Sequence, residues 1–258
     1  MIVWGTYVRR QRLGRVADFC KICRDMTAFR LTRVKQIGHL YFVPLSFGKT
    51  IGHFRRCEEC GVPYDAHPAE YESVQRSRTG DIVELATATH PQLGEKYAAR
   101  FELEDRVMSG RLTAEERRAL ILEPLVLLDP LVETRCANSH IDIRTAITAV
   151  ISIALFSTMI LWADASTGEM REWLFPAAWT IGGVVLLLTM LTWAGDVRRY
   201  IRREIHPKLI RALRSLNPSQ AELSEVLGRL KASKVKSGRK VRAKELYEAL
   251  RRDAGELA

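Results

Sequence analysis

Two cysteine pairs constrain the fold of this chain more than any other feature of its sequence. Cys20 and Cys23 lie in FCKIC, and Cys57 and Cys60 lie in RCEEC. In each pair the C-x-x-C spacing allows a tight turn that points two sulfur atoms toward one place. Thiol–disulfide exchange, structural disulfides and metal binding all use such pairs. Which of these three roles applies depends on the redox compartment of the protein, and the rest of the chain indicates that compartment.

Two apolar blocks without a single charged residue, 146–163 and 173–194, suggest where the chain resides. A helix needs roughly 20 apolar residues to cross the ~30 Å hydrocarbon core of a bilayer. We therefore expect a transmembrane helical hairpin over 143–195, with spans at about 145–164 and 173–194. A helical hairpin buried in a globular core is the alternative interpretation.

The distribution of basic residues predicts the orientation of this hairpin. Arg171 is the only basic residue in the segment between the blocks, whereas 196–214 carries seven Lys or Arg residues. Because the basic side of a membrane protein is cytoplasmic, both termini are expected in the cytoplasm. The chain is thus expected to be an integral protein of a bacterial cytoplasmic membrane, with the lipid bilayer as a partner. Ala178 and Gly182 have the small-x-x-x-small spacing that would permit a homo-oligomer.

A reducing cytoplasm disfavours disulfides, so the cysteine pairs predict a metal site. Four thiolates complete the tetrahedral shell of a structural Zn²⁺, and the predicted ligands are Cys20, Cys23, Cys57 and Cys60. The 33 residues between the pairs exceed the usual spacing of about 15–20. They are rich in β-formers, which indicates two to three short antiparallel strands. Gly61 follows the second pair, where a positive φ is expected.

Other interpretations of the cysteines stay open at this point. A thioredoxin-like motif needs one pair within a βαβ unit, and an iron–sulfur cluster also uses four thiolates. Three histidines near the cysteines, His39, His53 and His67, could replace one of the ligands. Cys136 lies far from both pairs and is expected to be a small buried apolar residue.

Several motifs in the first quarter resemble a known family. They are WGTYVRR, FCKIC, HLYFVPLSFGK and RCEECGVPYD, which together cover about residues 1–68. The chain resembles a family of membrane-associated zinc-ribbon proteins of prokaryotes. The resemblance implies a four-cysteine zinc ribbon ahead of transmembrane helices, and it supplies no biochemical activity.

Helix-start signals occur on both sides of the apolar blocks. Thr113 with Glu116 and Ser219 with Glu222 have the S/T-x-x-E spacing of a capping box. Helices are therefore expected in the middle region 69–142 and in the basic tail 196–258. Within that tail, 231–244 is strongly basic and would contact lipid, nucleic acid or solvent alone.

These observations predict a multi-domain α+β membrane protein. A small β-rich zinc ribbon (1–68) would precede a helical linker region (69–142), the transmembrane hairpin (143–195) and a basic helical cytoplasmic tail (196–258). No catalytic motif occurs, so we expect a non-enzymatic, membrane-anchored adaptor that holds a cytosolic or membrane protein partner. Two alternatives stay open: a nucleic-acid-linked zinc-ribbon module tethered to the membrane, whose ribbon or 231–244 cluster would contact phosphates, and a subunit of an envelope or transport assembly.

Overall fold

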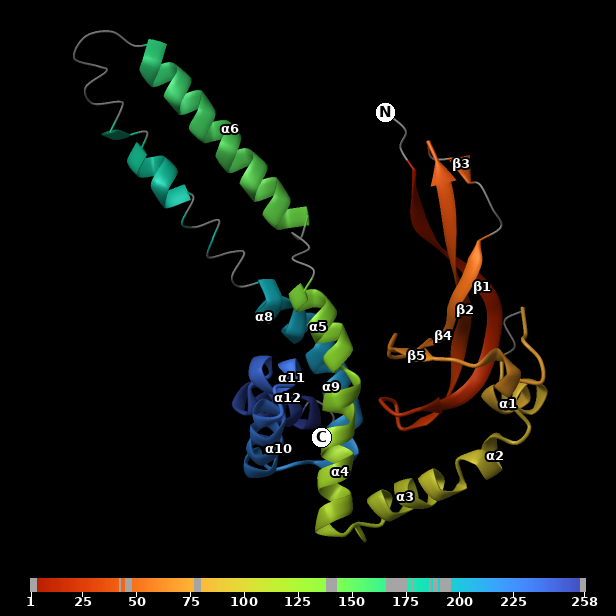
Figure 1. Ribbon diagram of the computed structural model, residues 1–258. Coiled ribbons are helices and arrows are strands. Elements are labelled where there is room, and N and C mark those ends of the chain that lie inside the picture. Colours follow the sequence, from red (N-terminus) through yellow and green to blue (C-terminus); the bar gives the residue numbers. More distant parts are fainter. Residues whose placement is uncertain are drawn as a thin grey trace. The chain divides into compact units, whose positions relative to one another are not determined.

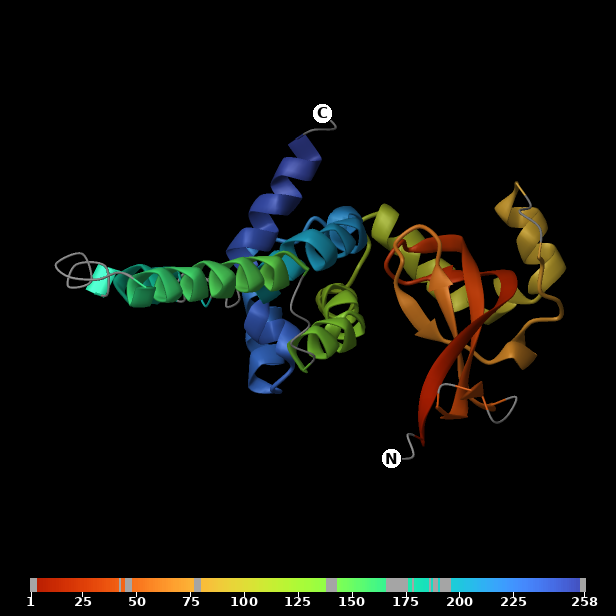
Figure 2. The same ribbon diagram turned by 90° about the horizontal axis from the view of Figure 1, so that it is seen from above.

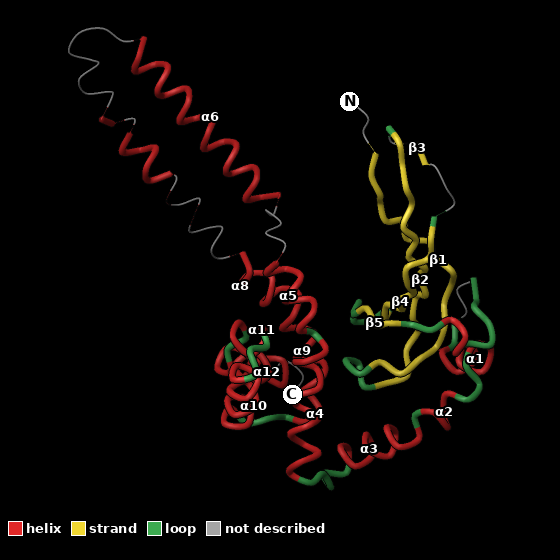
Figure 3. The backbone as a smooth tube through the Cα atoms, viewed as in Figure 1, coloured by secondary structure: helices red, strands yellow, loops and turns green. Residues whose placement is uncertain are grey.

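The computed structural model describes residues 4–41, 43–44, 48–76, 80–137, 143–165, 176–177, 179–185, 187, 190 and 196–255. Its contacts define two units, and each unit draws on separate parts of the chain. The first consists of Met1–Leu125, Lys208–Val226 and Ala243–Ala258, and the second of Val126–Pro207 and Leu227–Arg242. The strands come first in the sequence and helices follow (Figure 3).

An antiparallel sheet forms the N-terminal part of the first unit (Figure 1). Its strands are β1 (Trp4–Cys20), β2 (Asp25–Leu40), β3 (Val43–Pro44), β4 (Lys49–Cys57) and β5 (Pro63–Asp65). The order is β1-β2-β4-β5, and β3 pairs with β2. Antiparallel strands between the cysteine pairs are thus confirmed, although β2 is 16 residues long rather than short. The long strand β1 before the first pair was not predicted.

The first two strands form a hairpin that carries much of the buried core. Its ladder runs from Trp4 opposite Leu40 to Cys20 opposite Asp25, with a β-bulge between Arg12 and Gly14. On one face near the cysteines, Val16, Phe29 and Leu31 are completely buried. Fully burying such side chains contributes about 1.5–3 kcal/mol each.

Helices cover the other face of the sheet close to the cysteines. Helix α1 (Ile82–Thr89) contacts β1 and β2 and lies beside the sheet in both ribbon views (Figure 1, Figure 2). Ala17 of β1 packs with Leu85 and Ala86 of α1 and with Leu93 of α2 (Leu93–Lys96). The small Ala17 side chain leaves room for this close packing. The Thr89 hydroxyl accepts a hydrogen bond from the Ala17 amide at 3.0 Å, which ties the helix to the strand.

Further helices follow along the described chain. They are η1 (Pro68–Glu70), α3 (Ala98–Met108), α4 (Ala114–Leu127), α5 (Asp129–Ala137), α6 (Ile143–Ala165), α8 (Asp196–Tyr200), η2 (Ile201–Ile205), α9 (His206–Leu213), η3 (Arg214–Leu216), α10 (Gln220–Ala232), α11 (Lys236–Lys240) and α12 (Ala243–Gly255). The segment η2 is a π-helix that ends two residues before Pro207. A wider turn accommodates a proline that would clash with the carbonyl four residues earlier in a regular α-helix.

Both predicted capping boxes are confirmed. Before α4, the Thr113 hydroxyl accepts from the Glu116 amide at 3.2 Å, and the Glu116 carboxylate accepts from the Thr113 amide at 3.0 Å. Before α10, the same exchange joins Ser219 and Glu222 at 3.2 and 2.7 Å. Glu222 also accepts a hydrogen bond from Arg117 of α4 at 2.6 Å, so this cap links two helices of the first unit.

We expect Glu222→Gln to destabilise the first unit by about 1 kcal/mol at neutral pH, because it weakens a cap and a solvent-screened ion pair. The hydrogen bond from Arg117 lowers the pKa of Glu222 to about 2. A lowered folded-state pKa stabilises the protein at neutral pH, and this contribution disappears as the pH falls from about 4.5 toward 2. Urea unfolding should therefore show that the difference in unfolding free energy between Glu222→Gln and wild type becomes smaller as the pH falls across that range. Glu225→Gln, at an exposed site 3.6 Å from Arg118, is the control and should change little.

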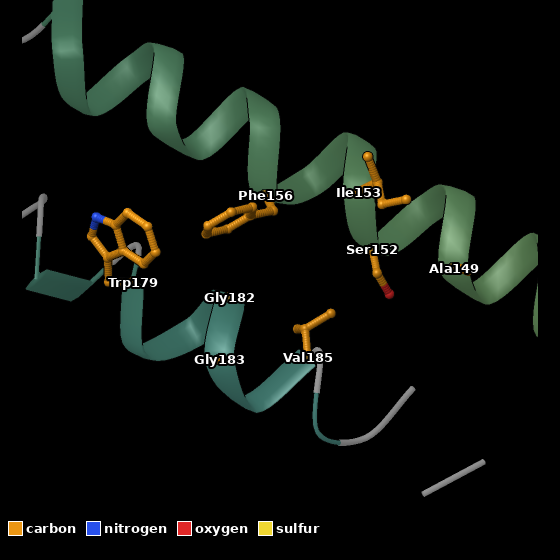
Figure 4. A pocket seen from close by; sticks show the side chains of 8 residues that line it. All are labelled: Ala149, Ser152, Ile153, Phe156, Trp179, Gly182, Gly183 and Val185. Atoms are coloured by element: carbon orange, nitrogen blue, oxygen red, sulfur yellow. The ribbon is translucent and has the colours of Figure 1, made fainter. Parts of the chain in front are cut away.

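In the second unit, two apolar helical segments pack against each other. The Phe156 ring of α6 meets Trp179 edge-on, with centroids 5.7 Å apart. Gly182 faces Phe156 so closely that an added Cβ would lie 2.2 Å from the ring. Figure 4 shows these side chains around an apolar hollow of about 290 Å³. Gly182 thus packs against another helical segment of the same chain, whereas Ala178 lies outside the described residues and the homo-oligomer stays a prediction.

The predicted transmembrane hairpin is wrong. Among the residues that the structure describes, no helix is both long and apolar enough to cross a bilayer. Helix α6 includes Arg144 and Asp164 near its ends, with five Ser or Thr residues between them. Of the second block, only 176–177, 179–185, 187 and 190 are described, so it contributes no continuous helix of the required length. The fold class is therefore corrected to an N-terminal antiparallel sheet followed by helices, and the predicted integral membrane localisation is withdrawn with the hairpin.

Candidate metal centre

The two cysteine pairs lie in two turns with the same backbone design. Cys20 ends β1, and the Arg24 amide donates to the Cys20 carbonyl at 2.6 Å. Cys57 ends β4, and the Gly61 amide donates to the Cys57 carbonyl at 3.1 Å. In both turns the fourth residue after the first cysteine has a positive φ, 58° at Arg24 and 71° at Gly61. The positive φ predicted for Gly61 is confirmed.

Arg24 is an unusual residue for a left-handed backbone position. Residues with a Cβ adopt this conformation at a cost of roughly 1–2 kcal/mol. The Arg24 guanidinium forms a 2.6 Å ion pair with Glu104 of α3 and donates to the Ser215 hydroxyl at 2.8 Å. These contacts offset the backbone strain and connect the first cysteine turn to two helices of the same unit.

The sheet brings the four sulfur atoms together despite the 33 residues between the pairs. Strand β2 leads away from the first turn, and β4 returns beside it, with Cys57 opposite Phe29. The Sγ atoms of Cys20 and Cys60 are 3.6 Å apart, and those of Cys23 and Cys57 are 3.8 Å apart. All four lie within 4.8 Å of one another.

These distances identify the kind of site. A disulfide needs sulfur atoms about 2.05 Å apart, and all five cysteines are free thiols. A metal–sulfur bond of about 2.3 Å in a tetrahedron corresponds to sulfur–sulfur separations of about 3.8 Å. The observed separations match four ligands of one ion, and they are too short for the several atoms of an iron–sulfur cluster. The cysteines thus form a cluster compatible with a single structural metal ion.

Polar groups around the sulfur atoms complete the centre. The Cys23 amide donates to the Cys20 sulfur at 3.4 Å, and the Tyr64 hydroxyl lies 3.4 Å from the same atom. The Thr27 hydroxyl lies 3.4 Å from the Cys57 sulfur, and the Arg211 guanidinium donates to the Cys23 sulfur at 3.7 Å. Groups of this kind orient metal ligands and adjust their charge.

The close packing of the thiols changes their acidity in opposite directions. Hydrogen bonding with the Cys20 thiol lowers the pKa of Cys57 and raises the pKa of Cys23. Burial, followed by the charge of Cys20, raises the pKa of Tyr64, so its hydroxyl stays protonated and can donate to sulfur. Without a metal, the four clustered sulfur atoms share their protons unevenly. A divalent ion would let all four become thiolates.

The nearby histidines are not part of this group. The metal-compatible cluster in the described residues contains the four cysteines alone. The His53 ring instead accepts a hydrogen bond from Arg33 at 3.3 Å, and His39 packs on the Tyr7 ring at 5.8 Å. Cys136, on α5, is half-buried rather than fully buried.

Sequence reasoning missed three residues of the centre: Thr27, Tyr64 and Arg211. The first two lie four residues after a cysteine, Thr27 after Cys23 and Tyr64 after Cys60, so proximity along the chain was an available signal. Arg211 lies 188 positions from its sulfur partner, and only the fold reveals the contact. Comparisons of the chain with protein families, with curated proteins and with solved structures find no match in any of the three.

Proposed function

We propose that the chain is a non-enzymatic interaction module whose sheet is held together by a structural zinc ion. The observation that carries the proposal is the close approach of four thiols, all within 4.8 Å, at the ends of two strands. Four cysteine ligands fill the tetrahedral shell of Zn²⁺ and leave no position for a substrate, which is the arrangement of structural sites. The resemblance to zinc-ribbon proteins agrees with this proposal and stays a prediction.

The surroundings of the cysteines support zinc through their charge. Zn²⁺ with four thiolates carries a net charge of about −2, and burying such a charge is costly unless polar groups compensate. Arg211 supplies a cation, while the Cys23 amide, Thr27 and Tyr64 supply hydrogen-bonding groups. The protein partner and the homo-oligomer that the sequence suggested stay predictions.

Metal analysis of the purified full-length chain tests the proposal. We expect one zinc ion per chain by inductively coupled plasma mass spectrometry, and a protein without visible absorption. Replacement by Co²⁺ should give the intense absorption of a tetrahedral thiolate site, since the ligands impose that geometry. A folded sheet with almost no bound metal would contradict the proposal, and stoichiometric iron with a coloured protein would assign the site to a different ion.

A further inference from the structure

The end of the sheet that lies far from the cysteines carries basic residues and no acidic ones. We call residues 4–14, 31–41 and 48–54 the basic arm; they are parts of β1, β2 and β4 with adjoining residues (Figure 1). The arm has six cationic residues and no Asp or Glu: Arg9, Arg10, Arg12, Arg33, Lys35 and Lys49. Asp18, Asp25, Glu58 and Glu59 lie close to the cysteines in the sequence, whereas Asp65 of β5 lies opposite Phe54 at the border of the arm.

Strand register places some of these cations directly against one another. Arg9 lies opposite Lys35 in the ladder between β1 and β2. Like charges at directly opposite positions destabilise a sheet. No described carboxylate forms an ion pair with Arg9 or Lys35. This repulsion persists in the protein alone, and a bound anion would relieve it.

In a second pair of facing cations, a carboxylate compensates the repulsion between the two like charges. Arg15 lies opposite Arg30, and the Glu58 carboxylate contacts both, at 2.7 and 3.4 Å. The two arginines, with Arg12 and Arg76, line a hollow of about 660 Å³ at the β-bulge. Neither Arg12 nor Arg76 has an ion pair with a described carboxylate, so the hollow stays cationic. The hollow adjoins the basic arm and could bind one phosphate group.

Arg33 lies on the same face of the sheet as Arg9 and Lys35, and Arg12 lies on the other face. His53 of β4 lies beside Arg33 of β2, which donates to its ring at 3.3 Å. Partial burial, together with the charge of Arg33, lowers the pKa of His53. Cations therefore lie on both faces of the arm.

Exposed aromatic rings lie among these cations. Trp4 is 80% exposed and Tyr7 is 39% exposed, and both are on β1 within a few residues of Arg9. Tyr41, at the end of β2, is 53% exposed. Bases of single-stranded nucleic acid stack on such rings while cations track the phosphates. A lipid headgroup or an acidic protein supplies the charge but not the stacking bases, and a duplex keeps its bases stacked inside.

The basic segment 231–244, by contrast, is partly used within the second unit. The Ser237 amide donates to Asp129 of α5 at 2.6 Å, and Lys236 forms a 3.2 Å ion pair with Glu133. Ser237 is 1% exposed. Its internal contacts make this segment a weaker candidate for binding an external polyanion than the arm.

We propose that the basic arm binds single-stranded nucleic acid, with Arg9, Arg12 and Lys35 contacting phosphates and with Trp4 and Tyr7 stacking on bases. This inference deepens the proposed function, since the metal centre would hold the strands that present the arm.

Fluorescence anisotropy with the full-length, metal-loaded chain and a labelled single-stranded oligonucleotide of about 16 nucleotides tests this proposal. We expect the double variant Arg9→Gln with Arg12→Gln to weaken binding at least ten-fold at low salt. The slope of log affinity against log salt should fall by about 1.4, because each phosphate contact on a single strand contributes about 0.7. Separately, Trp4→Leu with Tyr7→Leu should weaken single-strand binding by about thirty-fold or more, because each of the two stacked bases contributes about 1–3 kcal/mol.

Matched controls separate the arm from general basicity. Arg111→Gln with Arg118→Gln removes the same charge from exposed positions outside the sheet and should leave binding unchanged. Lys231→Gln with Lys234→Gln tests the tail, and loss of binding in this variant alone would overturn the proposal. So would equal binding of duplex, or binding to phosphatidylglycerol vesicles without binding to the oligonucleotide.

Metal content and far-UV circular dichroism measured on each variant distinguish this inference from the proposed function. The arm variants should keep the metal and the fold of the parent. Iron in place of zinc, with the oligonucleotide still bound through the arm, would overturn the zinc assignment and leave this inference standing. Stoichiometric zinc in a chain that binds no oligonucleotide would overturn this inference and leave the zinc assignment standing.

Discussion

Replacing Cys57 with Ser is expected to abolish stoichiometric metal binding and to unfold the sheet. Cys57 is 1% exposed and ends β4, so its sulfur is a fixed part of the four-thiol group. A structural Zn²⁺ contributes about 10–16 kcal/mol of apparent binding free energy at pH 7. The whole folding free energy of a typical domain is about 5–15 kcal/mol. Loss of this ion should therefore remove most of the stability of the sheet. Metal analysis and loss of the strand signal in circular dichroism measure the effect.

Cys136→Ser is the matched control, because it removes a thiol outside the cluster. That variant should keep the metal and the melting behaviour of the parent. A Cys57→Ser protein that retained both a full complement of metal and an intact sheet would refute the role of this residue. Acidification provides an independent test: the ligands must be deprotonated to bind, so the wild-type protein should release metal as the pH falls.

The cysteine cluster could be predicted because a metal site requires particular residues at a short, fixed spacing in the sequence. A C-x-x-C turn is a short-range structure, and two of them supply one complete tetrahedral shell. The same holds for the capping boxes at Thr113 and Ser219, where the three-residue spacing determines the hydrogen bonds. The strands between the pairs followed from their β-formers and from the need to bring distant thiols together.

The route to the metal site nevertheless contained a wrong step. Disulfides were excluded by the cytoplasmic location that a transmembrane hairpin would impose, and that hairpin is corrected. The exclusion now depends on sulfur separations of 3.6 and 3.8 Å. The mean hydropathy is an average over a block of residues, so it does not define the residues at which a helix begins and ends. The long β1 was missed for a related reason: its distal half is stabilised by pairing with β2, and not by an apolar pattern of its own.

Contacts between distant parts of the chain were beyond the reach of sequence patterns. Arg211 reaches Cys23 across 188 positions, and Arg117 reaches Glu222 across 105. Nothing in the composition near these residues distinguishes them from the many other arginines of a basic chain. The buried pair of Asp18 and Arg55 belongs to the same class, and it leads to the second large prediction.

Arg55→Met is expected to destabilise the sheet by about 3–5 kcal/mol, because it leaves a buried carboxylate without its cation. The Asp18 side chain is completely buried, and the Arg55 guanidinium donates to it at 2.7 Å. Asp18 also accepts a hydrogen bond from the Tyr71 hydroxyl at 2.7 Å. Burial acts to lower the pKa of Arg55, but the Asp18 carboxylate and the Tyr71 hydroxyl together outweigh it and raise that pKa. The guanidinium additionally lies over the Phe29 ring, 5.5 Å from its centroid.

Arg56→Met, at the next position of β4, supplies the control. Arg56 is exposed and lies opposite Arg30, so its loss removes a like-charge neighbour and should change the unfolding free energy by less than about 0.5 kcal/mol. A double-mutant cycle with Asp18→Asn separates charge from packing. If the ion pair carries the effect, Arg55→Met costs much less in a chain that already carries the Asp18→Asn substitution. An equal cost in both backgrounds, measured by urea unfolding, would assign the loss to the packing of Arg55 on Phe29 instead, since that contact does not depend on the carboxylate.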